Sequence, residues 1–315
     1  MSHNYSKILI TGGAGFIGSH LVDRLLVDDF EVTLIDNLST GNLDNISRHD
    51  GKKNFHLLRG DIRRLDLVKR AVKEAEAVFH EAAVLSWTGS RKSLVRLNHV
   101  NVSGTLALLN ASVDSDVKRF IYASSAAVYG EASPQPQRED LSPEPISPYG
   151  VSKLSAEQYV RVFHKLYGLE TVCLRYFNVY GPRQKYGPYS GVITKFMNRI
   201  SKNEPPIIYG DGEQTRDFVN IKDVVDANML ALTTKSAVGE VLNIGTGVAS
   251  RIRELAKTLQ EIMGQKRVKP IRAGLRPADI RHSWADINRA KKVLAYDPKV
   301  SLRSGLRELA KYFRG

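Results

Sequence analysis

A tyrosine and a lysine four residues apart, Tyr149 and Lys153, follow a proline in the stretch PYGVSK (148–153). Four residues are just over one turn of an α-helix, so the two side chains would share one face. A free tyrosine has a pKa of about 10, too high for a base at neutral pH, but a lysine ammonium one turn away favours the phenolate form. The pair therefore suits proton exchange with a hydroxyl group. The alternative interpretation is an ordinary amphipathic helix on which both residues face solvent.

A glycine-rich stretch near the N-terminus, TGGAGFIG (11–18), has the spacing of a phosphate-binding loop. Gly13, Gly15 and Gly18 form G-x-G-x-x-G, and a second series, G-x-x-G-x-x-G, begins at Gly12. An apolar run precedes the loop and a helical pattern follows it, which is the context that this motif requires. Without side chains, the backbone amides come close to a pyrophosphate at the positive end of the helix. The alternative is a glycine-rich turn without a ligand.

Asp36 ends the second apolar run, close to the position about 20 residues downstream where a dinucleotide site places an acid. Its carboxylate would bind the ribose hydroxyls and repel a 2′-phosphate, and Asn37 and Leu38 supply no arginine for such a phosphate. We therefore expect NAD rather than NADP as the cofactor. Asp61, after the third run, is a candidate for contact with the adenine, and HEAA (80–83) would place small residues beside the cofactor.

The elements that must position these groups alternate along the first half of the chain. Short, uniformly apolar runs are typical of buried parallel strands, and helical patterns separate them. The alternation predicts an α/β fold: a doubly wound parallel sheet (a Rossmann domain) with a smaller mixed C-terminal lobe. The expected strands are 7–11, 31–36, 55–60, 77–82, 119–124, 171–176 and 240–245. We expect a dinucleotide-binding domain over 1–177, to which 219–246 returns, and a substrate lobe over 178–218 and 247–315.

The composition is that of an ordinary globular protein, with 315 residues, 42% of them hydrophobic and 25% charged. The single cysteine, Cys173, excludes an internal disulfide and a cysteine-rich metal site, and we expect no metal. No apolar run reaches the roughly 20 residues of a membrane span and no signal-peptide core is present, so we expect a cytoplasmic protein. The net charge of +13 is spread along the chain without a nucleic-acid motif, which favours anionic small ligands over nucleic acid.

Three motifs together, TGGAGFIG, YASSAAVYG (122–130) and SPYGVSK (147–153), resemble the extended short-chain dehydrogenase/reductase superfamily. Its members use a tyrosine and a lysine four apart with a serine or threonine on a nearby strand. The resemblance implies that Ser125, Tyr149 and Lys153 are catalytic, that Lys153 also holds the nicotinamide ribose, and that Ser124 lines the cofactor pocket. The residues expected to contact NAD are Gly12, Gly15, Phe16, Ile17, Gly18, Asp36, Asn37, Asp61, Ile62, Ala82, Ala83, Ser124, Tyr149 and Lys153.

The C-terminal half resembles nucleotide-sugar epimerases of the UDP-glucose 4-epimerase group. The similar stretches are LRYFNVYGPRQ (174–184), GDGEQTRDFVNIKDVV (210–225) and LRPADIRHSWADINRAKKVL (275–294). The resemblance implies a UDP-sugar substrate whose phosphates and uridine ribose are held by the polar residues of these stretches. The implied substrate-binding residues are Ser125, Asn178, Arg216, Arg276, Asp279 and Ser283. Ala278 stands where the group's R-P-G-D element usually has glycine.

The reaction that this resemblance implies is NAD-dependent 4-epimerisation of a UDP-hexose. Tyr149 would remove the proton of the sugar 4-hydroxyl while hydride moves to the nicotinamide; the 4-keto sugar would rotate, and hydride would return to its opposite face. The small Ser283 implies room for UDP-GlcNAc and UDP-GalNAc as well as UDP-glucose and UDP-galactose. The segment 85–98 departs from the group's usual sequence and leaves the preferred sugar open.

Two other kinds of function are alternatives. The first is another nucleotide-sugar reductase or dehydratase of the same superfamily, but Ala126 and Ala127 stand where 4,6-dehydratases carry the acid pair of T-D-E-V-Y. The second is a catalytically idle NAD-binding scaffold, which the presence of all three implied catalytic residues disfavours. Relatives in the group also imply a homodimer formed through 101–113 and 149–167.

Overall fold

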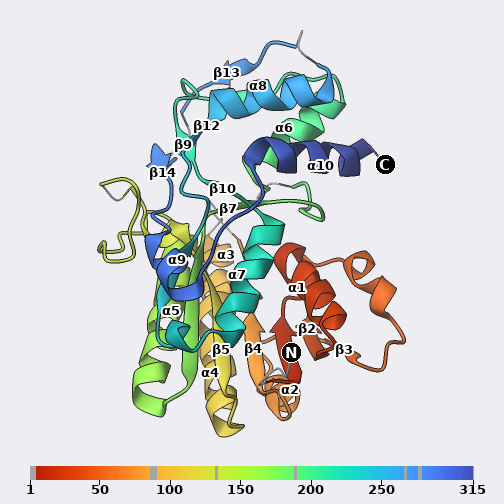
Figure 1. The fold of residues 1–315 in the computed structure, drawn as a ribbon, viewed down its shortest axis with the longest axis vertical. Coiled ribbons are helices and arrows are strands. Elements are labelled where there is room, and N and C mark those ends of the chain that lie inside the picture. Colours follow the sequence, from red (N-terminus) through yellow and green to blue (C-terminus); the bar gives the residue numbers. More distant parts are fainter. Residues whose placement is uncertain are drawn as a thin grey trace.

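The computed structural model describes residues 5–85, 91–131, 134–187, 190–265, 268–275 and 279–314. Seven parallel strands form its central sheet in the order β11-β6-β5-β4-β1-β2-β3 (Figure 1). They are β1 (Lys7–Thr11), β2 (Glu31–Asp36), β3 (Phe55–Arg59), β4 (Ala77–His80), β5 (Arg119–Ser125), β6 (Glu170–Tyr176) and β11 (Val241–Ile244). The predicted doubly wound sheet is confirmed, and each expected strand is present within one or two residues of its predicted bounds.

Helices cover both faces of this sheet. On one face, α1 (Phe16–Val27) and α7 (Ile221–Thr233) share a hydrophobic core with the strands. On the other face, the core includes residues of α2 (Leu65–Val72), α4 (Thr105–Asp114) and α5 (Pro148–Tyr167). Within β1, Ile8 and Ile10 belong to the first core and Leu9 to the second, because successive strand residues point to opposite sides. Strands that are buried on both faces must be apolar throughout, which explains the uninterrupted runs in the sequence.

The strand order reverses at β1, which pairs with β2 on one side and with β4 on the other. In a doubly wound sheet, such a switch point opens a crevice at the carboxyl ends of the strands, where ligands bind. The glycine loop leaves β1 at this edge, and the segments after β4 and β5 leave beside it. The topology therefore brings the glycine loop, the HEAA segment and Ser125 to one edge of the sheet.

A second group of elements, the lobe, begins where β6 leads into β7 (Asn178–Tyr180). Its helices α6 (Val192–Ser201), α8 (Ile252–Met263) and α10 (Leu302–Arg314) share a separate hydrophobic core and lie together at the top of Figure 1. Short strand pairs complete it: β7 with β10 (Phe218–Asn220), β8 (Ile207–Tyr209) with β13 (Ile271–Ala273), and β9 (Thr215–Arg216) between β12 (Ser250–Arg251) and β14 (His282–Ser283). One helix of the predicted lobe, α9 (Asn288–Leu294), instead packs against the sheet through Ala290 and Leu294.

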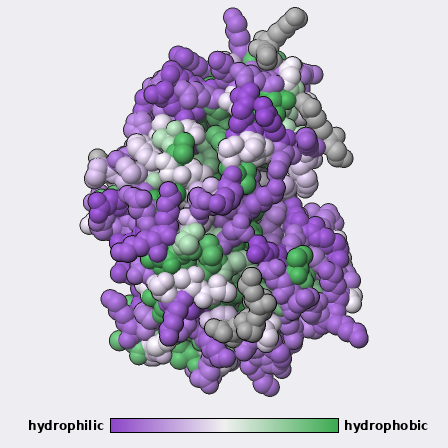
Figure 2. Space-filling view, in the orientation of Figure 1, coloured by the Kyte–Doolittle hydropathy of each residue, from purple (hydrophilic) through white to green (hydrophobic). Residues whose placement is uncertain are grey.

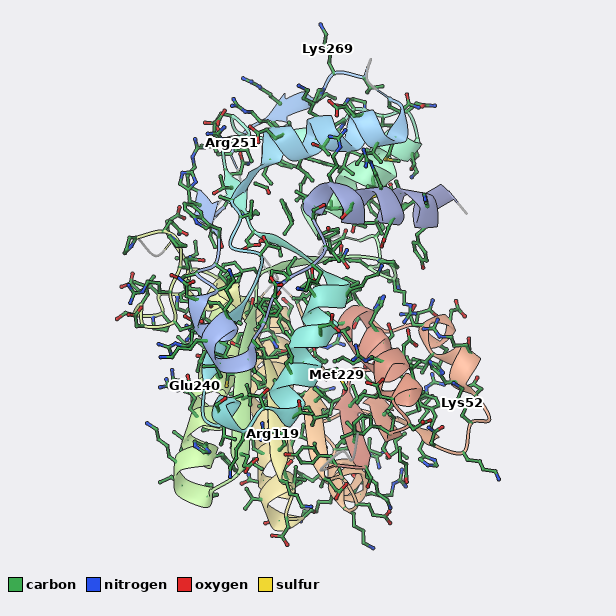
Figure 3. All side chains as sticks on the ribbon, viewed as in Figure 1. Lys52, Arg119, Met229, Glu240, Arg251 and Lys269 are labelled. Atoms are coloured by element: carbon green, nitrogen blue, oxygen red, sulfur yellow. The ribbon has the colours of Figure 1, made fainter. Side chains whose placement is uncertain are left out.

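The surface in Figure 2 is mostly hydrophilic, and small hydrophobic areas interrupt it without merging into one band. Charged residues occur on both parts of the molecule: Figure 3 places Arg251 and Lys269 on the lobe, and Lys52 and Glu240 on the sheet domain. Among the described residues, no helix has the length and apolar character needed to cross a membrane.

Candidate active site

The helix α5 carries the tyrosine–lysine pair and has a signal at each end. The hydroxyl of Ser147 accepts a hydrogen bond from the Gly150 N–H at 3.1 Å, and Pro148 occupies the first turn. Gly168 ends the helix in the left-handed conformation at φ 71°. Both Tyr149 and Lys153 face the protein interior, with exposures of 8% and 3%. The interpretation of this helix as one with solvent-facing Tyr149 and Lys153 is therefore wrong.

The ammonium group of Lys153 is held against β5. Its Nζ donates to the Ala123 carbonyl at 2.6 Å and lies 5.0 Å from the ring centre of Tyr122. Removal from water lowers the pKa of Lys153, while the negative charge of Glu81 acts in the opposite direction. The charge is thus stabilised by a carbonyl and an aromatic face rather than by solvent.

Ser125, at the end of β5, meets Tyr149. The Ser125 side chain is hydrogen-bonded to the phenol, and its Oγ accepts from the Ala127 N–H at 3.2 Å, which caps the short turn η4 (Ala126–Val128). Burial raises the pKa of Tyr149 to about 12, although the Ser125 hydrogen bond lowers it. In the chain without a cofactor, the loss of hydration outweighs the effects that favour the phenolate form of Tyr149.

The glycine loop has the tight backbone geometry of a dinucleotide site. Gly12 has φ +73°, and a Cβ at this position would lie 2.7 Å from the Ala82 backbone. A Cβ on Gly18 would lie 2.5 Å from the Gly12 carbonyl oxygen, so α1 packs directly on the loop. Gly15 is the N-cap of α1, with no capping side chain and no acid in the first turn. The positive helix end is therefore left for an anionic ligand.

Asp36 faces the same loop from the end of β2. Its two carboxylate oxygens accept hydrogen bonds from the Ala14 N–H at 3.0 Å and the Leu38 N–H at 2.7 Å. Burial raises the pKa of this carboxyl group, and the two backbone donors oppose that effect. Asp61 accepts from Asn37 at 2.8 Å and from the Arg63 guanidinium, which holds the pKa of Asp61 well below its usual range. The loop, Asp36 and Asp61 thus fit the phosphate, ribose and base ends of NAD.

His80 fixes the HEAA turn beside this loop. Thr105 Oγ1 donates to the Asn101 carbonyl at 2.7 Å and therefore accepts from His80 Nε2 at 2.8 Å. His80 Nδ1 then accepts from Thr11 Oγ1 at 2.7 Å, and that oxygen accepts from the Ala82 N–H at 3.3 Å. Burial lowers the pKa of His80 to about 3, which is consistent with this neutral form. The turn that carries Ala82 and Ala83 is thereby tied to β1, close to Gly12.

Ser124 is engaged differently from the prediction. Its hydroxyl donates to Glu157 Oε2 at 2.5 Å, and Glu157 also pairs with Arg175, whose Nη2 lies 2.6 Å from Oε1. All three side chains are buried, and the Arg175 guanidinium lies 4.7 Å from the Tyr129 ring centre. The Ser124 hydroxyl therefore belongs to a buried ionic network behind β5, and the place of Ser124 in the cofactor pocket stays a prediction. The three residues come from β5, α5 and β6, so no local spacing in the sequence signals this network.

The predicted substrate residues of the lobe meet in part. Arg216 on β9 is in register with Ser283 on β14, and its Nη2 donates to Asp279 Oδ1 at 2.6 Å. Two residues assigned to the substrate are thus paired with each other. The buried Ser283 donates from its hydroxyl to Gln137 Oε1 at 3.0 Å, a partner that sequence reasoning missed. Asn178 begins β7 with an exposed side chain, whereas Arg276 lies outside the described residues.

Known proteins resemble this chain over nearly its full length. Residues 8–245 match the NAD dependent epimerase/dehydratase family. A putative UDP-glucose 4-epimerase of Methanocaldococcus jannaschii is 39% identical over 309 residues, 98% of each chain. The structure of UDP-glucose 4-epimerase from Thermotoga maritima with UDP-glucose is 42% identical, with a TM-score of 0.92 and 98% of each chain covered. The structure of UDP-N-acetylglucosamine 4-epimerase from Methanobrevibacter ruminantium with UDP-N-acetylmuramic acid is 38% identical, with a TM-score of 0.93 and 99% of each chain covered.

Proposed function

This chain belongs to the NAD-dependent epimerase/dehydratase family, and on that premise we propose that it interconverts UDP-hexoses that differ at carbon 4 of the sugar. The observation that carries the proposal is the group of half-buried Ser125 with buried Tyr149 and Lys153, at the sheet edge where the glycine loop also leaves. Ala126 and Ala127 follow Ser125 directly, so the acid and base for elimination of water are missing from this turn. This favours epimerisation over the dehydratase reaction of the same family.

Cofactor binding is assigned to the glycine loop and to Asp36, because both suit a dinucleotide. The backbone packs closely at Gly12, Gly15 and Gly18, where no side chain would separate the amides from a pyrophosphate, and Asp36 would bind ribose hydroxyls. NAD, when bound, supplies a reversible hydride acceptor. The family description supports NAD as the cofactor, and Asp36 disfavours the additional phosphate of NADP.

Proton transfer is assigned to Tyr149. Its phenolate oxygen would take the proton of the sugar 4-hydroxyl, and the resulting phenol would later return that proton as the hydroxyl of opposite configuration forms, so no proton is consumed overall. Ser125, already hydrogen-bonded to this phenol, would hold the same sugar oxygen in place. Because burial holds the pKa of Tyr149 near 12, further positive charge must lie near the phenol before it acts as a base at neutral pH.

Substrate anchoring is assigned to the lobe. The diphosphate and uridine ribose would be held while the keto sugar rotates beside Tyr149. The residues assigned to this role are Asn178, Arg216, Arg276 and Asp279. Arginine suits this role because its planar guanidinium binds phosphate in a bidentate manner. Arg216 is engaged by Asp279 in the chain alone, so substrate phosphate would have to compete with that carboxylate or share the arginine with it.

The small side chain of Ser283 supports the acceptance of N-acetylated sugars, since a larger residue at this position would occupy more of the sugar site that the resemblance assigns to it. The similarity to a UDP-N-acetylglucosamine 4-epimerase agrees with this choice. We therefore propose UDP-GlcNAc/UDP-GalNAc as well as UDP-glucose/UDP-galactose as substrate pairs.

The test is incubation of the purified protein with UDP-galactose, and separately with UDP-GalNAc, in the presence of catalytic NAD. Chromatography should show conversion to the 4-epimer without accumulation of NADH. Tyr149→Phe is the matched control: it should bind NAD and unfold at the same temperature, yet convert substrate about 10²–10⁴-fold more slowly. Net NADH production would indicate a dehydrogenase, and NAD binding without turnover of either sugar would favour a scaffold or a different sugar nucleotide.

A homodimer through 101–113 and 149–167 is part of the proposal. Along α5, Tyr159, Val162 and Leu166 are exposed at intervals that place them on one helix face, with Leu166 70% exposed. An apolar stripe of this kind on the helix that begins with Tyr149 supports an interface beside the active site.

A further inference from the structure

Glu81 lies in the HEAA turn directly after β4, and the proposed mechanism does not use it. The residue is half-buried, and its Oε1 lies 2.9 Å from the Tyr176 hydroxyl. That hydroxyl also lies 2.9 Å from Asn228 Oδ1 on α7. These contacts therefore link the turn after β4, through Tyr176 at the end of β6, to helix α7 on one face of the sheet.

The hydrogen-bond donors and acceptors along these contacts can be assigned in order, beginning with Asn228. Asn228 Nδ2 donates to the Val224 carbonyl at 2.8 Å, so the amide oxygen is the atom that faces Tyr176. The Tyr176 hydroxyl has one proton but two oxygen neighbours, and both accept if Glu81 is ionised. One of the two short oxygen–oxygen contacts would then contain no hydrogen. A protonated Glu81 removes the conflict, because its O–H donates to Tyr176 and Tyr176 donates to Asn228.

The strand register places Tyr176 beside Ser125. Tyr176 on β6 is the parallel partner of Ser125 on β5, and the side chains of such partners project to the same face of the sheet. The titratable groups that act on Glu81 or feel its charge are Lys153 and Tyr149 of α5, Tyr122 of β5 and Tyr176 of β6. His80 precedes it on β4 and is neutral. Lys153 is thus the cationic neighbour of Glu81, and Tyr149 is the neighbour that must ionise.

We propose that Glu81 is a positioning residue that is present as a neutral carboxylic acid and holds the Glu81–Tyr176–Asn228 relay. Loss of its proton would place a negative charge near Tyr149 and Lys153 and so change how readily each of them ionises. Its link to catalysis rests on the proposed epimerase function, whereas its protonation state does not. Removal from water raises the pKa of Glu81 toward neutrality, with Lys153 opposing, which agrees with the proton count. When Glu81 gives its proton to solvent, the new negative charge raises the pKa of both Tyr149 and Lys153.

Infrared difference spectroscopy tests the protonation state in the full chain without substrate. Wild type minus Glu81→Gln should show the C=O stretch of a carboxylic acid at about pH 6, and the band should disappear by about pH 9. Glu76→Gln is the matched control, because Ser6 and Lys7 backbone donors lower the pKa of Glu76 to about 2, and its difference spectrum should show only carboxylate bands. Absence of the acid band for Glu81 at about pH 6 would overturn the proposal.

A second measurement tests the electrostatic coupling between Glu81 and Lys153. In Glu81→Gln, NMR of labelled lysine, assigned with Lys153→Met, should show Lys153 titrating about one pH unit lower than in the wild type. An unchanged Lys153 titration would refute the charge coupling. If Glu81→Gln fails to fold, Tyr176→Phe replaces it: this variant keeps the carboxyl group but removes its partner, so the acid band should shift in frequency, and an unshifted band would refute the relay.

The activity readout separates this inference from the proposed function. If epimerisation occurs, the rising limb of its pH–rate profile should move to lower pH in Glu81→Gln, because no negative charge then opposes ionisation of Tyr149. A rising limb that stays in place or moves to higher pH would contradict the role in catalysis. If no sugar is converted at all, the infrared and NMR results still decide the state of Glu81.

Discussion

At the scale of single residues, burial dominates the chemistry of this site. Tyr149, Lys153 and His80 all have pKa values displaced in the direction of the neutral form, because each is removed from water. Charge inside the site is therefore costly unless a specific partner stabilises it. The structure provides two such partners: the Ala123 carbonyl, which accepts from Lys153, and the Ser125 hydroxyl, which is hydrogen-bonded to Tyr149.

A prediction at this scale concerns the space beside Ser283. Replacing Ser283 with tyrosine should reduce kcat/KM for UDP-GalNAc at least about 10-fold relative to UDP-galactose, because a bulky ring would fill the space proposed for the N-acetyl group. Ser283→Ala is the control; it removes the hydrogen bond to Gln137 but adds no volume, so the ratio of the two sugars should change little. Equal loss of both activities in Ser283→Tyr would contradict the assignment.

At the scale of elements, two buried polar networks tie the strands and helices that carry the site. One joins β1, β4 and the helical segment around Thr105 through His80. The other joins β5, α5 and β6 through Ser124, Glu157 and Arg175. Both networks lie directly behind residues assigned to ligand binding, so their loss should disturb the position of the site as well as the stability of the fold.

The first element-scale prediction concerns Glu157. Glu157→Ala leaves the Arg175 guanidinium buried without its carboxylate, and the free energy of unfolding in urea should fall by about 3–5 kcal/mol. Asp66→Ala is the control, since it breaks the solvent-exposed ion pair with Arg64 and should leave the unfolding midpoint unchanged. Similar midpoints for the two variants would show that the buried pair is not a structural tie.

The second element-scale prediction concerns pH. Burial lowers the pKa of His80 from 6.5 to about 3, so between these values the unfolded chain binds more protons than the folded one. Stability should therefore fall as pH is lowered through this window, by up to about 1.4 kcal/mol per pH unit from this residue.

Urea unfolding at a series of pH values measures this slope. His80→Gln should be less stable at pH 7 but should lose stability less steeply on acidification. His56→Gln, which replaces an exposed histidine on β3, should keep the wild-type slope. If His80→Gln also keeps it, the acid sensitivity arises elsewhere.

At the scale of the whole molecule, the residues of the candidate site come from two separately packed bodies. The sheet has hydrophobic cores on both faces, and α6, α8 and α10 form another core in the lobe. The glycine loop and the catalytic group belong to the first body, whereas Arg216 and Ser283 belong to the strands of the second. We therefore expect substrate binding to stabilise the lobe and the sheet domain together.

The whole-molecule prediction is the oligomeric state. Light scattering should give about twice the chain mass of 35.1 kDa, and Leu166→Glu should convert the protein to a monomer by placing a charge in the proposed α5 interface. Val27→Glu is the control, because Val27 is a comparably exposed apolar residue on α1, outside the proposed interface. A wild-type monomer, or a dimer that Leu166→Glu leaves intact, would contradict the interface.

The sequence by itself was sufficient for the strand positions along the chain, the strand–turn–helix context of the glycine loop, the place of Asp36 at a strand end, and the shared helix face of Tyr149 and Lys153. These features depend on local spacing: an apolar run, a strand–turn–helix motif, or two residues one helical turn apart. The tertiary structure alone decided that Ser124 turns to Glu157, that Arg216 meets Asp279, and that Glu81 shares Tyr176 with Asn228. Each of the last three contacts joins residues from separate elements, and side-chain partners and loss of hydration depend on packing that no local pattern records.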